Sequence, residues 1–157
     1  MRIVVATDGS RGGRAALRFA ARLAGKDPAT ELIVVMVGGG EAEESKARVP
    51  ADSNNGRRRA QKVFDGAQRE LEGRNIRAEY RFVPQRASAP IPEAISREAD
   101  RLRADLVVVG SEGRDTIGEW VVGGVALRLI YVAQRPVAVV RPPRRTKTAR
   151  DVSLKTA

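Results

Sequence analysis

The amino-acid sequence predicts an α/β fold, with a single doubly wound five-stranded parallel sheet and helices on both faces. Short, almost continuous apolar runs recur along the chain, as strands buried on both faces of a parallel sheet require. Segments with apolar residues at helical spacing alternate with these runs. Such alternation indicates parallel strands joined by right-handed crossovers. The 157 residues are enough for one domain with a sizeable core.

The first half of the chain begins with two strands separated by a helix. RIVVAT at residues 2–7 is the first predicted strand, and Ser10 in the following turn is a good helix cap. A helical stripe follows over 12–24, and LIVVMV at 32–37 is the second strand. The polar stretch 41–56 contains Pro50 and Asn54-Asn55-Gly56, which predict a loop.

The second half continues the alternation to a fifth strand. Its predicted elements are a helical stripe from Ala60 to Leu71, a strand at 78–83, a helix whose start is framed by Pro90 and Pro92, a strand within 105–109, a helix over about 119–133 and a strand at 137–140. The periodicity stops after Arg141-Pro142-Pro143. We therefore expect one domain over residues 1–141 and a basic, disordered tail over 142–157.

Composition excludes several classes of function. The chain has no cysteine and no histidine, so thiolate sites, Ser-His-Asp triads and the common zinc sites are absent. No apolar run approaches the roughly 20 residues that cross a bilayer, and the N-terminus has no signal-peptide pattern. These features favour a cytoplasmic protein without a membrane partner.

The net charge of +10 is divided between the predicted domain and the tail. Residues 1–140 carry 23 basic and 18 acidic residues, giving +5, and residues 141–157 carry six basic residues and Asp151, giving the other +5. Only three Phe, two Tyr and one Trp are present, so base stacking has little support. The composition therefore favours a solvated basic surface over nucleic-acid binding.

The loops that follow the first, second and fourth strands are the candidate ligand site. In doubly wound sheets ligands bind beyond the carboxyl ends of the strands, where the strand order reverses. After the fourth strand the sequence reads Gly110-x-x-Gly113, then nine intervening residues, then Gly123-Gly124. Glycines at this spacing either let backbone N–H groups approach a nucleotide phosphate or only form a turn before a helix.

The chain resembles the universal stress protein family over roughly residues 1–141. The matching segments are VVATDGS, LIVVMV, LVVVGSEGR with WVVGGV, and RPVAVVR. The resemblance implies an adenine-nucleotide site, for ATP or another adenine nucleotide, with Mg²⁺ arriving only with the nucleotide. It places Gly110, Gly113 and Gly123 at the ribose and phosphates, with Gly124 and Val125 at the helix end. Asp8 then lies near the adenosine, and the Val37 backbone meets the adenine.

Three departures from the family pattern bear on nucleotide binding. Gly124 stands where nucleotide-binding members have Ser or Thr, so a hydroxyl is missing although the backbone N–H remains. Glu112 brings a carboxylate into the loop, and Arg114 is near enough in sequence to offset it; Asp115 adds another acid. Members that keep the fold without binding ATP exist, so a protein-interaction module is the alternative function.

An enzyme acting on an adenine nucleotide is a third possible function, and the residues favour it least. No residue pattern supplies a general base aimed at water, so turnover beyond slow, incidental ATP hydrolysis is not expected. The resemblance also implies a homodimer through the last strand, near Val137–Val140, which would cover an otherwise open sheet edge. The resemblance therefore implies a stress-response regulatory protein.

Overall fold

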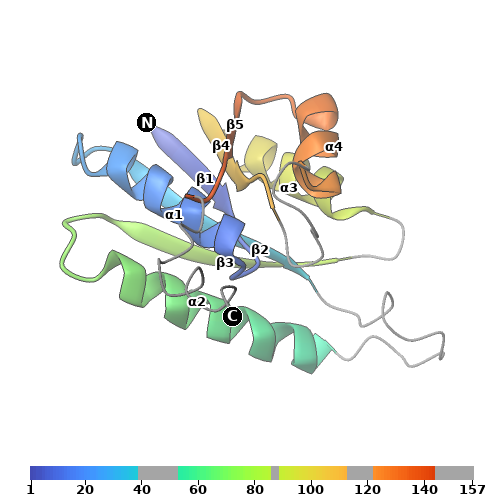
Figure 1. Cartoon of the computed structure of the whole chain (residues 1–157), viewed down its shortest axis with the longest axis horizontal. Helices are drawn as coiled ribbons and strands as arrows, with labels where there is room; N and C mark the ends of the chain where they lie inside the picture. The colour runs from blue at the N-terminus through green and yellow to red at the C-terminus, as the bar shows by residue number, and fades with distance from the viewer. Residues whose placement is uncertain (39–52, 86–88, 113–121, 144–157) are drawn as a thin grey trace, which may run out of the picture.

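The computed structural model describes residues 1–38, 53–85, 89–112 and 122–143, and these residues form one sheet with four helices (Figure 1). The strands are β1 (Arg2–Ala6), β2 (Glu31–Gly38), β3 (Ala78–Pro84), β4 (Leu106–Gly110) and β5 (Val137–Val140). The helices are α1 (Arg11–Ala24), α2 (Ser53–Leu71), α3 (Ile91–Arg101) and α4 (Gly124–Val132). Among the described residues, no helix is both long and apolar enough to span a membrane.

The sheet is parallel, with strand order β3-β2-β1-β4-β5. From β1 the chain winds outward to β2 and β3, and it then returns to β4 beside β1 and continues to β5. The order therefore reverses between β1 and β4, which is where this class of sheet opens a ligand crevice. The predicted doubly wound five-stranded sheet is confirmed.

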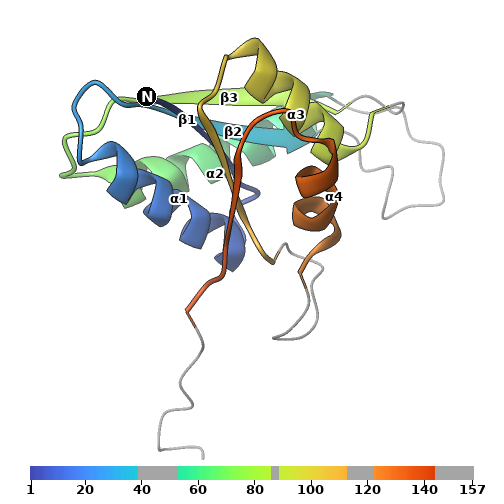
Figure 2. The same ribbon diagram turned by 90° about the horizontal axis from the view of Figure 1, so that it is seen from above.

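Helices α1 and α2 lie on one face of the sheet, and α3 and α4 lie on the other (Figure 2). An apolar layer lies between the sheet and each pair of helices. The layer under α1 and α2 includes Val5, Leu17 and Val34, and the layer under α3 and α4 includes Val4, Val107 and Leu129. Alternate strand residues point to opposite faces, so strands apolar on both faces bury both sets. This explains why the strand sequences are nearly continuous apolar runs.

Two predicted helix boundaries were wrong. Helix α2 begins at Ser53, within the stretch predicted as a loop, because Asn54-Asn55-Gly56 lies in its first turn. Polar residues that favour turns are also well suited to the beginning of a helix. Helix α4 begins at Gly124 rather than near residue 119; residues 122 and 123 are not helical, and 119–121 lie outside the described residues.

Candidate functional site

The turn after β1 is held by its own polar side chains. The Ser10 N–H donates to Asp8 Oδ1 at 2.9 Å, and the Ser10 Oγ accepts from the Gly13 N–H at 3.1 Å, which caps α1. Thr7 Oγ1 accepts from the Gly9 N–H at 3.2 Å. These bonds fix Asp8 at the carboxyl end of β1, and its side chain is half-buried.

Helix α1 approaches the loop after β4 through backbone contacts between glycines. A Cβ on Gly12 would lie 3.1 Å from the Glu112 nitrogen and still closer to the Glu112 carbonyl oxygen. A Cβ on Gly110 would lie 2.8 Å from the Gly12 Cα. Ser10 Oγ also donates to the Glu112 carbonyl at 3.4 Å. Only glycine permits this approach, so the two loops at the switch point are in direct contact.

The beginning of α4 is brought back to the end of β4 by one hydrogen bond. The Gly123 N–H donates to the carbonyl of buried Ser111 at 2.7 Å, and the Ser111 N–H donates to the Val140 carbonyl at 2.8 Å. Helix α4 therefore begins beside the carboxyl ends of β4 and β5. Its Gly123 cap has no side chain to bond the first N–H groups of the helix.

The first intrahelical hydrogen bond of α4 runs from the Leu127 N–H to the Gly123 carbonyl, at 3.0 Å. The N–H groups of Gly124, Val125 and Ala126 precede it and have no partner within the helix. No atom of the described residues lies within 4 Å of a Cβ built on Gly124, so the described part of the chain leaves this helix end open. An unfilled helix N-terminus attracts anions through its N–H groups and its dipole.

The structure brings most of the predicted site residues to one edge of the sheet. Asp8 follows β1, Val37 lies near the end of β2 and Gly110 ends β4, while Gly123, Gly124 and Val125 begin α4. Gly113 and Arg114 lie outside the described residues. Among the described residues, no group of three or more acidic side chains is placed to hold a metal ion.

The same fold occurs in proteins of known structure. A model of the universal stress protein family matches residues 1–141. The chain belongs to the universal stress protein family. A family protein from Burkholderia pseudomallei has a TM-score of 0.70 and 26% identity, over 90% of this chain and 96% of that one. No protein of curated function matches the chain.

Two further universal stress protein structures contain adenine nucleotides. One, in complex with cAMP, is 25% identical with a TM-score of 0.60, over 91% of this chain and 98% of the other. The Archaeoglobus fulgidus protein in complex with dAMP is 24% identical with a TM-score of 0.60, over 89% of this chain and 97% of the other.

Sequence reasoning did not identify Gly12 and Ser111 as residues that shape the site. Gly12 and Gly13 stand in the first turn of α1, where glycine disfavours a helix, and this pair was the available signal. Ser111 gave no signal, because its part is a backbone carbonyl that bonds a residue twelve positions away.

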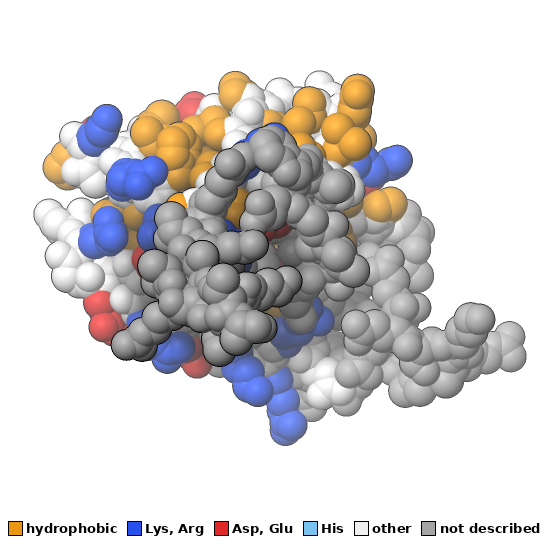
Figure 3. Space-filling view, viewed as in Figure 1, with side chains coloured by type: hydrophobic (Ala, Val, Ile, Leu, Met, Phe, Trp, Pro, Cys, Tyr) orange, Lys and Arg blue, Asp and Glu red, His pale blue; other side chains and the backbone are white. Residues whose placement is uncertain are grey.

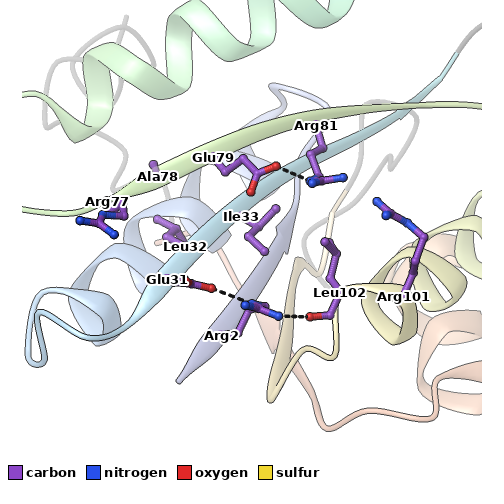
Figure 4. A pocket seen from close by; sticks show the side chains of 10 residues that line it. All are labelled: Arg2, Glu31, Leu32, Ile33, Arg77, Ala78, Glu79, Arg81, Arg101 and Leu102. Atoms are coloured by element: carbon purple, nitrogen blue, oxygen red, sulfur yellow. Dashed lines mark hydrogen bonds and ion pairs between the residues drawn. The ribbon is translucent and has the colours of Figure 1, made fainter.

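An open pocket of about 360 Å³ lies at the opposite end of the sheet, where the strands begin (Figure 4). Most of its charged side chains are already paired, and Arg77 is exposed. Arg2 Nε lies 2.7 Å from Glu31 and its Nη1 donates to the Leu102 carbonyl at 2.6 Å, while Arg81 Nε lies 2.5 Å from Glu79. These internal pairs occupy most of the charged groups of the described lining.

Proposed function

We propose that this universal stress protein binds an adenine nucleotide at the carboxyl ends of β1, β2 and β4 and acts as a stress-response regulator. The observation that carries the proposal is the bond from Gly123 to Ser111, which sets the open N-terminus of α4 beside the predicted nucleotide residues. The cAMP and dAMP complexes of related proteins support an adenine nucleotide as the ligand class.

The phosphates would bind at the beginning of α4. The N–H groups of Gly124 and Val125 supply donors, and the helix dipole adds a positive end. The open space at Gly124 leaves room for phosphate oxygens to approach the backbone. Loss of the family hydroxyl at this position removes one hydrogen bond from the site and leaves the backbone donors in place.

The nucleoside would bind across β1 and β2. Asp8 has a carboxylate that already accepts from the Ser10 N–H at one oxygen, and a carboxylate oxygen accepts more than one hydrogen bond. A ribose hydroxyl is a suitable donor to it. Val37 is half-buried at the end of β2, where its backbone would meet the adenine edge.

Calorimetric titration with ATP and Mg²⁺ tests this function. We expect micromolar binding by protein freed of copurified nucleotide. We expect Gly124→Ser to bind about tenfold more tightly, because a hydrogen bond to a charged group contributes about 1.5 kcal/mol or more and the site has room for the side chain. Gly66→Ser, within α2, is the matched control and should leave the affinity unchanged.

The absence of heat with wild-type protein and with Gly124→Ser would contradict nucleotide binding. The glycines would then serve only the contacts between loops. The remaining function would be that of a dimeric protein-interaction module, which rests on the apolar surface of α4 and on the open edge of β5.

Helix α4 and strand β5 together present the surface for the proposed homodimer. Leu127, Ile130 and Tyr131 occupy one side of α4 at helical spacing, and Tyr131 is 80% exposed. Apart from Met1, every exposed large hydrophobic residue among the described residues is on α4. Figure 3 shows hydrophobic side chains gathered over this part of the molecule.

The apolar side of α4 faces away from α3. Arg128, on another side of the helix, pairs with Glu93 of α3, and Ser96 Oγ donates to the Val132 carbonyl at 3.3 Å. The hydrogen bond from Arg128 holds the pKa of the Glu93 carboxyl below its usual value. Strand β5 packs against α4 and is the edge strand beyond β4. A second copy of the chain, paired along β5, would cover both.

Light scattering coupled to size exclusion tests the dimer. We expect a dimer for the wild-type protein and a monomer for Tyr131→Glu, because a charge placed in an apolar interface loses its hydration. Gln134→Glu adds the same charge at an exposed position just after α4 and should remain dimeric. A wild-type monomer at micromolar concentration, or a Tyr131→Glu dimer, would contradict this interface.

A further inference from the structure

The outer face of α1 is a strip of four arginines. Arg11, Arg14, Arg18 and Arg22 follow one another at intervals of three, four and four residues, which places them on one side of the helix. The opposite side, which includes Ala16, Leu17 and Ala20, is buried against the sheet. The sequence of α1 contains no acidic residue.

The strip keeps most of its charge unpaired. Within the part of the chain that the structure describes, Glu70 of α2 is the one acidic side chain that pairs with the strip, 3.4 Å from Arg18. Arg11 donates to the Pro143 carbonyl, and Arg14 donates to the Gly9 carbonyl at 2.6 Å. Each of these bonds uses one of the five N–H groups of a guanidinium, so donors and positive charge remain for a ligand.

The bond from Arg11 to Pro143 also fixes where the tail leaves the domain. Pro143 is the last described residue, and the sequence beyond it adds Arg144, Arg145 and Lys147. Residues 141–157 carry half of the net charge of the chain, and Pro143 of this segment lies at the N-terminal end of the arginine strip. Figure 3 shows basic side chains outnumbering acidic ones on this view of the molecule, outside the grey atoms.

We propose that the arginine strip of α1 binds the phosphate backbone of double-stranded DNA, independently of base sequence. From Arg11 to Arg22 the strip extends about 16 Å, which matches the axial rise of about five base pairs. A rigid helix with regularly spaced guanidinium groups suits a regular phosphate backbone. Contacts to phosphates carry no sequence information, so the proposed binding does not depend on the bases.

A duplex fits this face better than a single strand. Single strands bind through aromatic side chains on which bases stack, in addition to charge. The aromatic residue of α1 is Phe19, which is half-buried and has the Arg22 guanidinium over its ring at 5.9 Å. The strip therefore offers charge without a free stacking surface.

Fluorescence anisotropy with a labelled, mixed-sequence duplex of about 20 base pairs, between about 50 and 200 mM salt, tests the proposal. We expect log affinity to fall linearly with log salt concentration. The full-length variant Arg14→Gln/Arg18→Gln/Arg22→Gln should reduce the magnitude of that slope by about 2 to 3 and weaken binding at low salt at least about tenfold. Arg11 is left unchanged in this variant because its side chain donates a hydrogen bond to the Pro143 carbonyl.

The matched control removes three exposed arginines elsewhere, in Arg77→Gln/Arg97→Gln/Arg103→Gln, and should bind like the wild-type protein. Thermal unfolding of each variant checks that the fold is retained. No duplex binding, equal losses in the two triple variants, or equal affinity for a single strand of the same length would overturn the proposal. The proposal would also be overturned if the tail variant Arg144→Gln/Arg145→Gln/Lys147→Gln lost duplex binding while the arginine-strip variant kept it.

Discussion

We expect Gly12→Ala to lower the free energy of unfolding by about 3 kcal/mol, which lowers the melting temperature by about 6 to 12 °C. The new Cβ would lie within 3.1 Å of the Glu112 backbone nitrogen and closer to its carbonyl oxygen. Both partners are main-chain atoms, so no side chain can rotate aside. Relief requires α1 to move away from the loop after β4, which disturbs packing against β4. Urea and thermal unfolding measure the loss.

The control for this prediction is Gly124→Ala. Its Cβ has no neighbour within 4 Å among the residues that the structure describes, and it stands in the first turn of α4. We expect stability equal to or slightly above that of the wild-type protein, because alanine favours a helix over glycine by up to about 1 kcal/mol. Equal effects of the two substitutions would mean that the contact between Gly12 and Glu112 does not hold the loops together.

Gly12→Ala also separates the effect on folding from the effect on ligand binding. Glu112 lies within the predicted phosphate loop, between Gly110 and Gly113, so a displaced Glu112 moves that loop. We therefore expect Gly12→Ala to weaken ATP binding even at temperatures where the variant remains folded. Unchanged affinity in the folded variant would show that the contact serves only stability.

The order of elements was predictable because β1, β2 and β4 are apolar on both faces. VAVV at residues 137–140 is the fifth strand with the predicted bounds, and LIVVMV lies within β2. The errors occurred where local preference is ambiguous. Asn54-Asn55-Gly56 fits either a turn or the beginning of a helix, and only its packing in α2 decides between them.

The position of the site was also predictable, because the carboxyl ends of parallel strands meet at one edge of the sheet. Asp8, Val37 and Gly110 lie there as expected. The contacts between the loops were not predictable from local sequence. Gly12 meets Glu112 across a hundred residues, and the bond from Gly123 to Ser111 joins main-chain atoms, which leave no side-chain pattern.

Leu129→Ala should lower the free energy of unfolding by about 3 kcal/mol, within the range of 2 to 5 kcal/mol typical of buried leucines. Leu129 has no exposed surface and packs with Ile95 and Val107 between α4 and the sheet. Truncation leaves a cavity that the rigid strands cannot close. Its neighbour Ile130 is 52% exposed on the apolar side of α4. Denaturant unfolding over a range of protein concentrations measures the unfolding free energy of Leu129→Ala and of the comparison variant Ile130→Ala.

Ile130→Ala distinguishes the two faces of α4. At concentrations low enough to keep the protein monomeric, we expect its unfolding free energy to stay within about 0.5 kcal/mol of the wild-type value, as for most surface substitutions. At high concentration the wild-type protein should gain stability from association by mass action, and Ile130→Ala should gain less. Leu129→Ala should lose the same stability at every concentration at which its dimer still forms. If the unfolding free energy of the wild-type protein did not change with protein concentration, the exposed apolar side of α4 would bind no second copy of this chain.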